Sequence, residues 1–266
     1  MLPDQFQTFA AEFPLEHVHA GVAAGNGFLG LSVWGEGDTV NVTVSSSSLW
    51  DHQGGEIWSP DQSYKNICAA LAKQDENRMK ELFPWYKLVP SIIPLARIAF
   101  QLDGAHKVEL SHRDSLLTVF GKDKRVEIRL SQSEKGVFAI RGISDFRLIP
   151  GYDLAPVLKE RGFAEPERLA DGFRQTMPKD PAFGIRYAKG AGATFFRFSR
   201  DVIAASSGSW SALEEENRRF WNDFWMKVPE LHSGMAEIDA RYCAGLFQFQ
   251  CMTASDGFPA GLQGPW

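Results

Sequence analysis

The residues of this chain that are best suited to chemistry lie between positions 48 and 58, in the run SLWDHQGGEIW. Two tryptophan rings, two carboxylates and one imidazole accompany a pair of glycines that favour a loop. Aromatic rings pack against the C–H faces of sugars, and planar polar groups bind sugar hydroxyls. The run therefore indicates a carbohydrate-binding loop, with Trp50, Asp51, His52 and Trp58 as candidate sugar-binding residues.

The same residues also fit a structural role, because tryptophan is usually a core residue and aspartate often caps a turn. Glycoside hydrolysis needs two carboxyl groups about 5–10 Å apart. Asp51 could be combined with Glu56 or Asp61, but the spacing does not distinguish these groups from solvated surface carboxylates. We therefore assign no catalytic residue.

Two further groups of residues have the side-chain types of a metal site or of a serine nucleophile. His17 and His19 lie two apart, so on a strand they would share a face. A pair leaves a metal ion short of the three or four ligands that protein sites normally provide, although His52 could approach through the fold. The serines from Ser45 to Ser48 do not belong to a G-x-S-x-G elbow. We expect no metal, no cofactor and no serine nucleophile.

The glycines of GNGFLG, from Gly25 to Gly30, match the spacing of a dinucleotide-binding fingerprint. That fingerprint requires a helix directly behind the glycines, whose N-terminus holds the pyrophosphate. Here the following residues, LSVWGEGDTV, read as a strand and a turn. The glycines are better explained by a tight turn and close backbone approach.

Short strands dominate the region up to about residue 205. Val40, Val42 and Val44 alternate with polar residues, which is the period of a half-buried strand. From 91 to 205, short apolar runs are separated by turn residues, as in an antiparallel meander. The pattern predicts a mainly β fold, an antiparallel β-sandwich, rather than a parallel α/β sheet.

Two segments interrupt this pattern. Residues 63–83 have apolar side chains at roughly helical spacing and are followed by Pro84, so they predict an inserted helix. Residues 150–190 contain several prolines and glycines and read as loops around one or two strands.

The chain becomes helical after Ser211, which has capping-box spacing to Glu214. The first helix has an aromatic face that includes Trp221 and Trp225. A second helix is expected from about Met235 to Ser255, with one apolar stripe made of Ile238, Tyr242, Leu246 and Phe249.

The charge, apolar content and cysteine count of the chain limit its expected partners and cellular location. The chain has 266 residues, of which 28 are basic and 33 acidic, and no basic stripe, so nucleic acid is not an expected partner. No apolar run is long enough for a membrane span, and the N-terminus lacks a signal-peptide pattern. A cytoplasmic location is expected, or a secreted or periplasmic one if the numbering starts after a removed signal. Cys68, Cys243 and Cys251 are expected to be free, buried thiols.

Two stretches together resemble a known enzyme family. AGNGFLGLSVWGEGDTVNVTVSSSSLWD resembles the start of the N-terminal β-sandwich in the fucosidase-like glycoside hydrolases of family 95, which are related to family 65. The stretch from RRFWNDFW to GLQGPW resembles the linker helices and the first segment of their (α/α)6 catalytic barrel. The matching residues are Gly25, Asn26, Gly27, Gly30, Asn41, Leu49, Trp50, Trp221, Trp225, Tyr242, Pro259, Leu262, Gln263, Gly264 and Trp266.

The resemblance implies a division of the chain into three parts. Residues 1–208 would form a β-sandwich of the supersandwich type, residues 209–255 the linker helices, and residues 256–266 the start of the catalytic barrel. The general acid and its partner would lie in that barrel, so this chain alone would be inactive. The loop at 50–58, with Gln263 and Trp266, would help to shape the sugar site.

One departure from the family pattern concerns specificity. The relatives usually continue the Leu-Trp pair with Ser-Gly, whereas this chain has Asp51-His52-Gln53-Gly54-Gly55. The departure suggests a glycan other than a fucoside.

Two other functions stay open at this point. The chain could be a free-standing carbohydrate-binding module, which would need an exposed ring platform within the sandwich. It could also be an interaction or scaffold protein that docks a partner on the aromatic helix at 211–227. An exposed apolar stripe on the C-terminal helices predicts self-association, or fraying after about residue 230.

Overall fold

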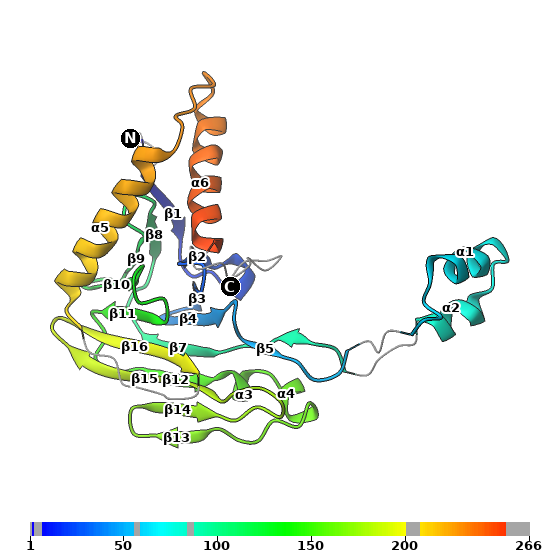
Figure 1. Ribbon diagram of the computed structural model, residues 1–266. Coiled ribbons are helices and arrows are strands. Elements are labelled where there is room, and N and C mark those ends of the chain that lie inside the picture. Colours follow the sequence, from blue (N-terminus) through cyan, green and yellow to red (C-terminus); the bar gives the residue numbers. More distant parts are fainter. Residues whose placement is uncertain (1, 3–6, 56–58, 84–87, 201–207, 254–266) are drawn as a thin grey trace.

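Alternating apolar residues build the inner faces of two antiparallel β-sheets, and two long helices follow the sheets in the chain (Figure 1). The computed structural model describes residues 2, 7–55, 59–83, 88–200 and 208–253. Within these ranges, no helix is long and apolar enough to cross a membrane. The predicted mainly β, antiparallel sandwich followed by C-terminal helices is confirmed.

The larger sheet has nine strands and the smaller has five among the described residues. In spatial order the larger sheet contains β1 (Thr8–Glu12), β8 (Lys107–Ser111), β9 (Leu116–Phe120), β10 (Arg125–Leu130), β11 (Val137–Arg141), β16 (Ala193–Arg200), β15 (Phe183–Gly190), β14 (Gly172–Gln175) and β13 (Glu167–Leu169). The smaller contains β12 (Arg147–Pro150), β7 (Ala96–Gln101), β4 (Thr39–Ser46), β3 (Leu29–Glu36) and β2 (Val22–Gly25). A two-stranded ribbon pairs β5 (Trp50–Asp51) with β6 (Ser91–Ile92).

One hydrophobic core joins the two sheets. Val40, Val42 and Val44 of β4 are fully buried, as their alternation predicts. They belong to the same cluster as the inward-facing residues of β10, which are Val126, Ile128 and Leu130. The cluster extends from the sheets to the C-terminal helices through buried rings such as Trp221 and Phe247.

The segment at 63–83 forms two helices and not the single helix that its spacing predicts. Helix α1 (Tyr64–Ala72) and helix α2 (Glu76–Leu82) are separated by a turn in which Gln74 has a φ of 53°. The turn ends at Asp75, whose side chain accepts from the Arg78 N–H and caps α2. Figure 1 shows this helical hairpin standing apart from the two sheets.

The segment at 150–190 is more regular than its prolines and glycines suggest. It contains two short helices, α3 (Gly151–Leu154) and α4 (Val157–Glu160), followed by β13, β14 and the start of β15. The hairpins of β13, β14 and β15 extend the larger sheet by cross-strand pairing. Long-range pairing of this kind leaves little local signal in the sequence.

Helix α5 (Trp210–Lys227) has Ser209 as its N-cap residue, so the expected capping box at Ser211 and Glu214 is not formed. Ser211 lies in the first turn, where its hydroxyl pairs with that of Ser209 at 2.8 Å. The aromatic face of α5 packs inward, and the Trp225 Nε1–H donates to the His112 carbonyl at 2.8 Å. The helix is therefore anchored to the larger sheet.

Helix α6 (Ala236–Met252) packs on β2 and α5, and Tyr242 and Leu246 of the expected stripe are partly buried against the same core. The buried residues are Cys243, Phe247 and Cys251, and Phe247 stacks on Trp221 with ring centroids 4.6 Å apart. Ile238 and Phe249, at the ends of the expected stripe, are exposed at 41% and 64%. Cys68 is exposed, so the expectation that all three thiols are buried is wrong for it.

Candidate functional site

The loop that follows β4 carries the sugar-binding candidates into the ribbon of β5 and β6. Trp50 pairs with Ile92 and Asp51 with Ser91. Beyond them Gly54 has a φ of +74°, and a Cβ there would lie 2.0 Å from the Leu88 carbonyl oxygen. Only glycine fits this close approach, so Gly54 holds the loop against the returning chain.

Asp51 lies beneath this loop and is fully buried. Its carboxylate forms an ion pair with Arg161 at 2.5 Å and accepts a hydrogen bond from the Gln53 backbone N–H at 3.1 Å. Arg161 also donates to the Val89 carbonyl at 2.9 Å, and its own carbonyl accepts from the Gln53 side chain at 2.8 Å. Asp51 therefore organises the loop from within, and its predicted contact with a sugar stays a prediction.

His52 lies on the surface of the loop and pairs with a distant carboxylate. The His52 Nδ1 lies 2.6 Å from Asp180 Oδ1, and the His52 backbone N–H donates to Asp180 Oδ2 at 2.9 Å. The His52 side chain is 60% exposed, whereas that of Asp180 is only 11% exposed. One carboxylate thus holds both the backbone and the ring of His52.

The electrostatic surroundings of Asp180 favour its ionised form. Burial alone would raise its pKa, but the hydrogen bonds from His52 and the charges of His52 and Arg200 outweigh burial, so the pKa is lowered. Arg200 also donates to the Ser48 carbonyl at 3.0 Å. Arg200 therefore binds the start of the loop at Ser48, and Asp180 binds it at His52.

Trp50 connects the loop to the glycine turn and to α6. Its indole N–H donates to the Ser47 carbonyl at 3.0 Å, and the Ser47 hydroxyl donates to the Gly27 carbonyl at 3.0 Å. The Gly27 N–H in turn donates to the Cys251 carbonyl at 2.8 Å, near the end of α6. A chain of hydrogen bonds therefore joins the loop, the turn and the last helix.

The side chain of Asn26 stabilises the glycine turn through hydrogen bonds. Its buried side-chain oxygen accepts from the Leu29 N–H at 2.8 Å, and its amide donates across to the Ser131 carbonyl at 2.7 Å. The turn joins β2 to β3, so a strand follows the glycines, as the sequence predicts, and not the helix of a dinucleotide site.

Three of the six sugar-binding candidates, Trp58, Gln263 and Trp266, lie outside the described residues, as does Glu56. Asp61 lies beside the helical hairpin, where it forms an ion pair with Arg78 at 3.3 Å. The described part of the chain therefore brings together Trp50, Asp51 and His52, and places Asp61 in a separate, exposed pair.

The histidine pair near the N-terminus does not lie on a strand. His17 precedes a short 3-10 helix (Val18–Ala20), which contains His19. The condition under which the two would share a strand face is therefore not met. In the ranges that the structure describes, no three His, Cys, Asp or Glu side chains are grouped so that they could hold a metal ion.

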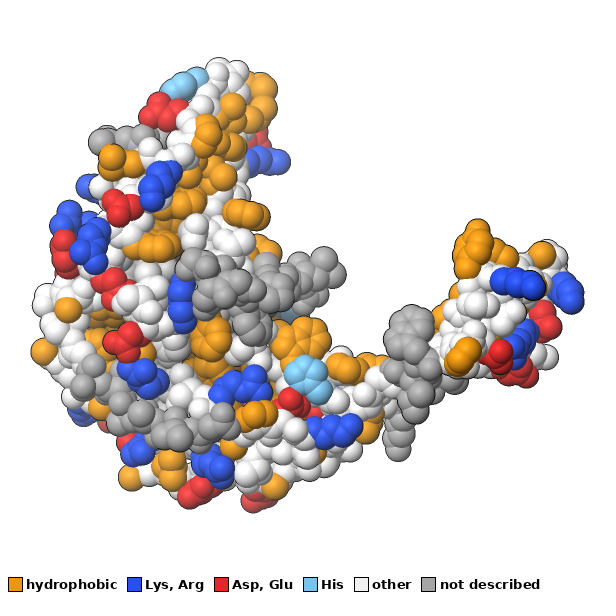
Figure 2. Space-filling model, in the orientation of Figure 1, with side chains coloured by type: hydrophobic (Ala, Val, Ile, Leu, Met, Phe, Trp, Pro, Cys, Tyr) orange, Lys and Arg blue, Asp and Glu red, His pale blue; other side chains and the backbone are white. Residues whose placement is uncertain are grey.

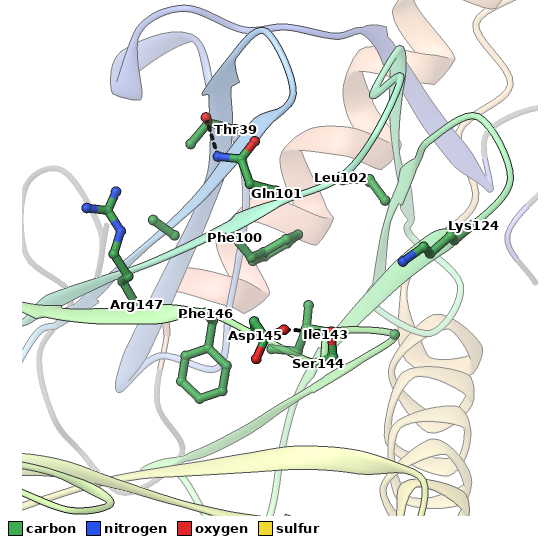
Figure 3. A pocket seen from close by; sticks show the side chains of 12 residues that line it. Thr39, Phe100, Gln101, Leu102, Lys124, Ile143, Ser144, Asp145, Phe146 and Arg147 are labelled. Atoms are coloured by element: carbon green, nitrogen blue, oxygen red, sulfur yellow. Dashed lines mark hydrogen bonds between the residues drawn. The ribbon is translucent and has the colours of Figure 1, made fainter.

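A separate cleft of about 460 Å³ opens between β7 and the turn that follows β11 (Figure 3). Gln101 and the segment from Ser144 to Arg147 line two sides of it, with Phe100 between them. The Gln101 amide donates to the Thr39 hydroxyl at 2.9 Å. The wall at Gln101 is polar, whereas Phe100 is only 4% exposed and belongs to the core.

Arg161, Asp180 and Arg200 were missed by the sequence analysis. They lie 110, 128 and 152 residues from their partners in the loop. The only local sign is Asp180 itself, which precedes Pro181 in a turn-forming run. Their role emerges only from the folded chain.

Comparison with models of known protein families and with curated proteins yields no match.

Proposed function

We propose that this chain is the non-catalytic N-terminal β-sandwich domain of a glycoside hydrolase similar to family 95. The observation that carries the proposal is the contact between the two stretches that resemble the family. Gly27 and Cys251 are more than 200 residues apart in the chain, yet the Gly27 N–H donates to the Cys251 carbonyl at 2.8 Å.

In this proposal the loop beginning at Trp50 contributes one wall of the sugar site. Trp50 and His52 would contact the glycan, and Asp51 would hold the loop in shape through Arg161. The general acid and base would come from a following (α/α)6 barrel. Trp58, Gln263 and Trp266 complete the proposed set of sugar-binding residues.

The test is hydrolysis of a panel of aryl glycosides by the protein translated from the whole gene, with the 266-residue chain measured beside it. We expect release of the aryl group from at least one glycoside by the whole product and none by the chain alone. Failure of the whole product on every α- and β-linked sugar of the panel would refute the proposal.

The cleft beside Gln101 favours a second candidate, a carbohydrate-binding module. This function predicts that the chain alone binds monosaccharides, and that Gln101→Ala abolishes the binding. Isothermal titration calorimetry of the chain and the variant decides between the two candidates.

The aromatic helix gives less support to the scaffold alternative. Trp210, Trp221 and Trp225 are all buried, so these rings are packed in the protein and not presented to a partner.

A further inference from the structure

His52 presents a hydrogen-bond acceptor to solvent in a fixed orientation. An ionised carboxylate can only accept hydrogen bonds, so the proton of neutral His52 is on Nδ1, which lies 2.6 Å from Asp180. Nε2 then carries the free lone pair. Because Asp180 also accepts from the His52 backbone N–H, the ring cannot easily rotate away from this arrangement.

The hydrogen bond from the His52 ring to Asp180 is not needed to hold the loop in place. The backbone bond at 2.9 Å alone would tie residue 180 to the loop. The additional ring bond leaves 60% of the His52 side chain open to solvent while its carboxylate partner is nearly buried. This combination resembles the way in which a carboxylate fixes the tautomer of a functional histidine.

The neighbours of His52 fit a ligand with both hydroxyl and C–H surfaces. Side chains alternate along a strand, so in β5 the Trp50 side chain points away from the side on which Asp51 is buried, and the exposed His52 follows directly in the chain. Trp50 is half-buried and its N–H is already bonded to Ser47, which leaves its ring as an apolar surface. A ring surface beside an acceptor suits a sugar.

We propose that His52 Nε2 accepts a hydrogen bond from a hydroxyl of the glycan, and that Asp180 is the positioning residue that holds the proton of the neutral ring on Nδ1, so that Nε2 is the acceptor. This inference rests on the proposed function, because it assigns the contact within the same sugar site. Neither residue takes part in bond cleavage.

Two substitutions at His52 separate sugar binding from loop fastening. The amide of Asn reaches the position of Nδ1 and can still donate to Asp180, so His52→Asn keeps the fastening and removes the acceptor. The amide of Gln reaches the position of Nε2, so His52→Gln keeps an acceptor and loses the fastening. Both variants are made in the protein translated from the whole gene and assayed on the best aryl glycoside of the panel.

For His52→Asn we expect KM to rise about five- to tenfold, the loss of one hydrogen bond, with kcat and Tm unchanged. His52→Gln should keep KM closer to that of the unmodified protein. The matched control is His106→Asn, because the exposed His106 also directs Nδ1 at an acceptor, the Gly104 carbonyl at 3.1 Å. It should leave KM unchanged.

Asp180→Asn provides an independent test if His52→Asn does not fold. The Asn amide donates to Nδ1 and moves the ring proton to Nε2, which ¹⁵N NMR of His52 detects directly. KM should again rise. An unchanged KM in both variants would overturn the inference and leave the proposed function standing, whereas a whole product that cleaves no glycoside would overturn both.

Discussion

At the scale of single residues, the pair of Asp51 and Arg161 determines whether the loop keeps its shape. Asp51 is fully buried and Arg161 nearly so, and their closest atoms are 2.5 Å apart. Removing one partner of a buried pair leaves the other charge without compensation, which costs about 3–5 kcal/mol. We expect Arg161→Ala to lower the free energy of unfolding by this amount, measured by urea denaturation.

The matched control for that substitution is Arg168→Ala. Arg168 pairs with Asp153 at 2.6 Å, but both side chains are partly exposed. A pair in solvent contributes less than about 1 kcal/mol. Equal losses in the two variants would contradict the role assigned to the buried pair.

The three cysteines should differ sharply in reactivity. Cys68 is exposed, whereas Cys251 is fully buried, and burial raises the pKa of the Cys251 thiol to about 12. Because the thiolate is the reactive form, Ellman's reagent should modify Cys68 quickly in the native protein and Cys251 only after unfolding. Cys68→Ser should remove the fast phase, and a fast phase that survives would contradict the assignment.

The raised pKa of Cys251 also makes stability depend on pH. The folded state keeps the thiol proton that the unfolded state releases above pH 9.0. The stabilisation of the folded state by the protonated Cys251 is therefore fully present below pH 9.0. The free energy of unfolding should therefore fall between pH 9.0 and about 12, by up to about 1.4 kcal/mol per pH unit from this group. Cys251→Ala should reduce that slope, and an unchanged slope would contradict the cause.

At the scale of elements, one carboxylate of α5 accepts three of the hydrogen bonds that hold this helix to the larger sheet. Glu216 Oε1 accepts from the Ser131 hydroxyl at 2.9 Å and from the backbone N–H groups of Gln132 at 2.5 Å and Ser133 at 2.8 Å. We expect Glu216→Ala to lower the free energy of unfolding by about 2–4 kcal/mol, because these donors lose their shared acceptor. Urea denaturation followed by tryptophan fluorescence measures the loss.

Glu215→Ala is the control on the same helix. Glu215 pairs with Arg218 at 2.6 Å in an exposed position, so its removal should leave stability nearly unchanged. If the two variants were equally stable, the anchoring of α5 through Glu216 would be wrong.

The strands were the most predictable elements, because their signal is local. The alternation of Val40, Val42 and Val44 and the turns of the meander depend only on neighbouring residues. The break between α1 and α2 was not predictable in the same way, because Gln74 adopts a backbone conformation that few residues other than glycine favour. The helical spacing of apolar residues continues across this turn, so the spacing does not show where α1 ends and α2 begins.

Only the part of the candidate site that lies in one continuous run of sequence was predictable. Trp50, Asp51 and His52 stand together in the sequence, and their residue types suggested a sugar site. The charges that hold them come from Arg161 and Asp180, whose separation in the chain carries no pattern. The residue type of Asp51 predicts a sugar ligand, and the buried ion pair with Arg161 is visible only in the fold.

At the scale of the whole molecule, exposed apolar side chains gather on the C-terminal helices and the connection between them. Figure 2 shows hydrophobic side chains along this region. The exposed residues are Met226, Leu231, Met235, Ile238 and Phe249. Because large exposed patches favour association, we expect the chain to self-associate as its concentration rises.

The double substitution Ile238→Ser and Phe249→Ser should shift the chain toward the monomer in sedimentation velocity. Tyr64→Ser is the control, because Tyr64 is also a large, exposed side chain but lies on the separate helical hairpin. If only the control reduced association, the hairpin and not the C-terminal helices would carry the contact.

The central claim is that this sandwich serves a glycoside hydrolase whose catalytic barrel follows it. Sequencing the gene downstream of the codon for Trp266 tests that claim most directly. We predict that the reading frame continues for several hundred codons and encodes helices sufficient for an (α/α)6 barrel. A stop codon directly after Trp266 would contradict the claim.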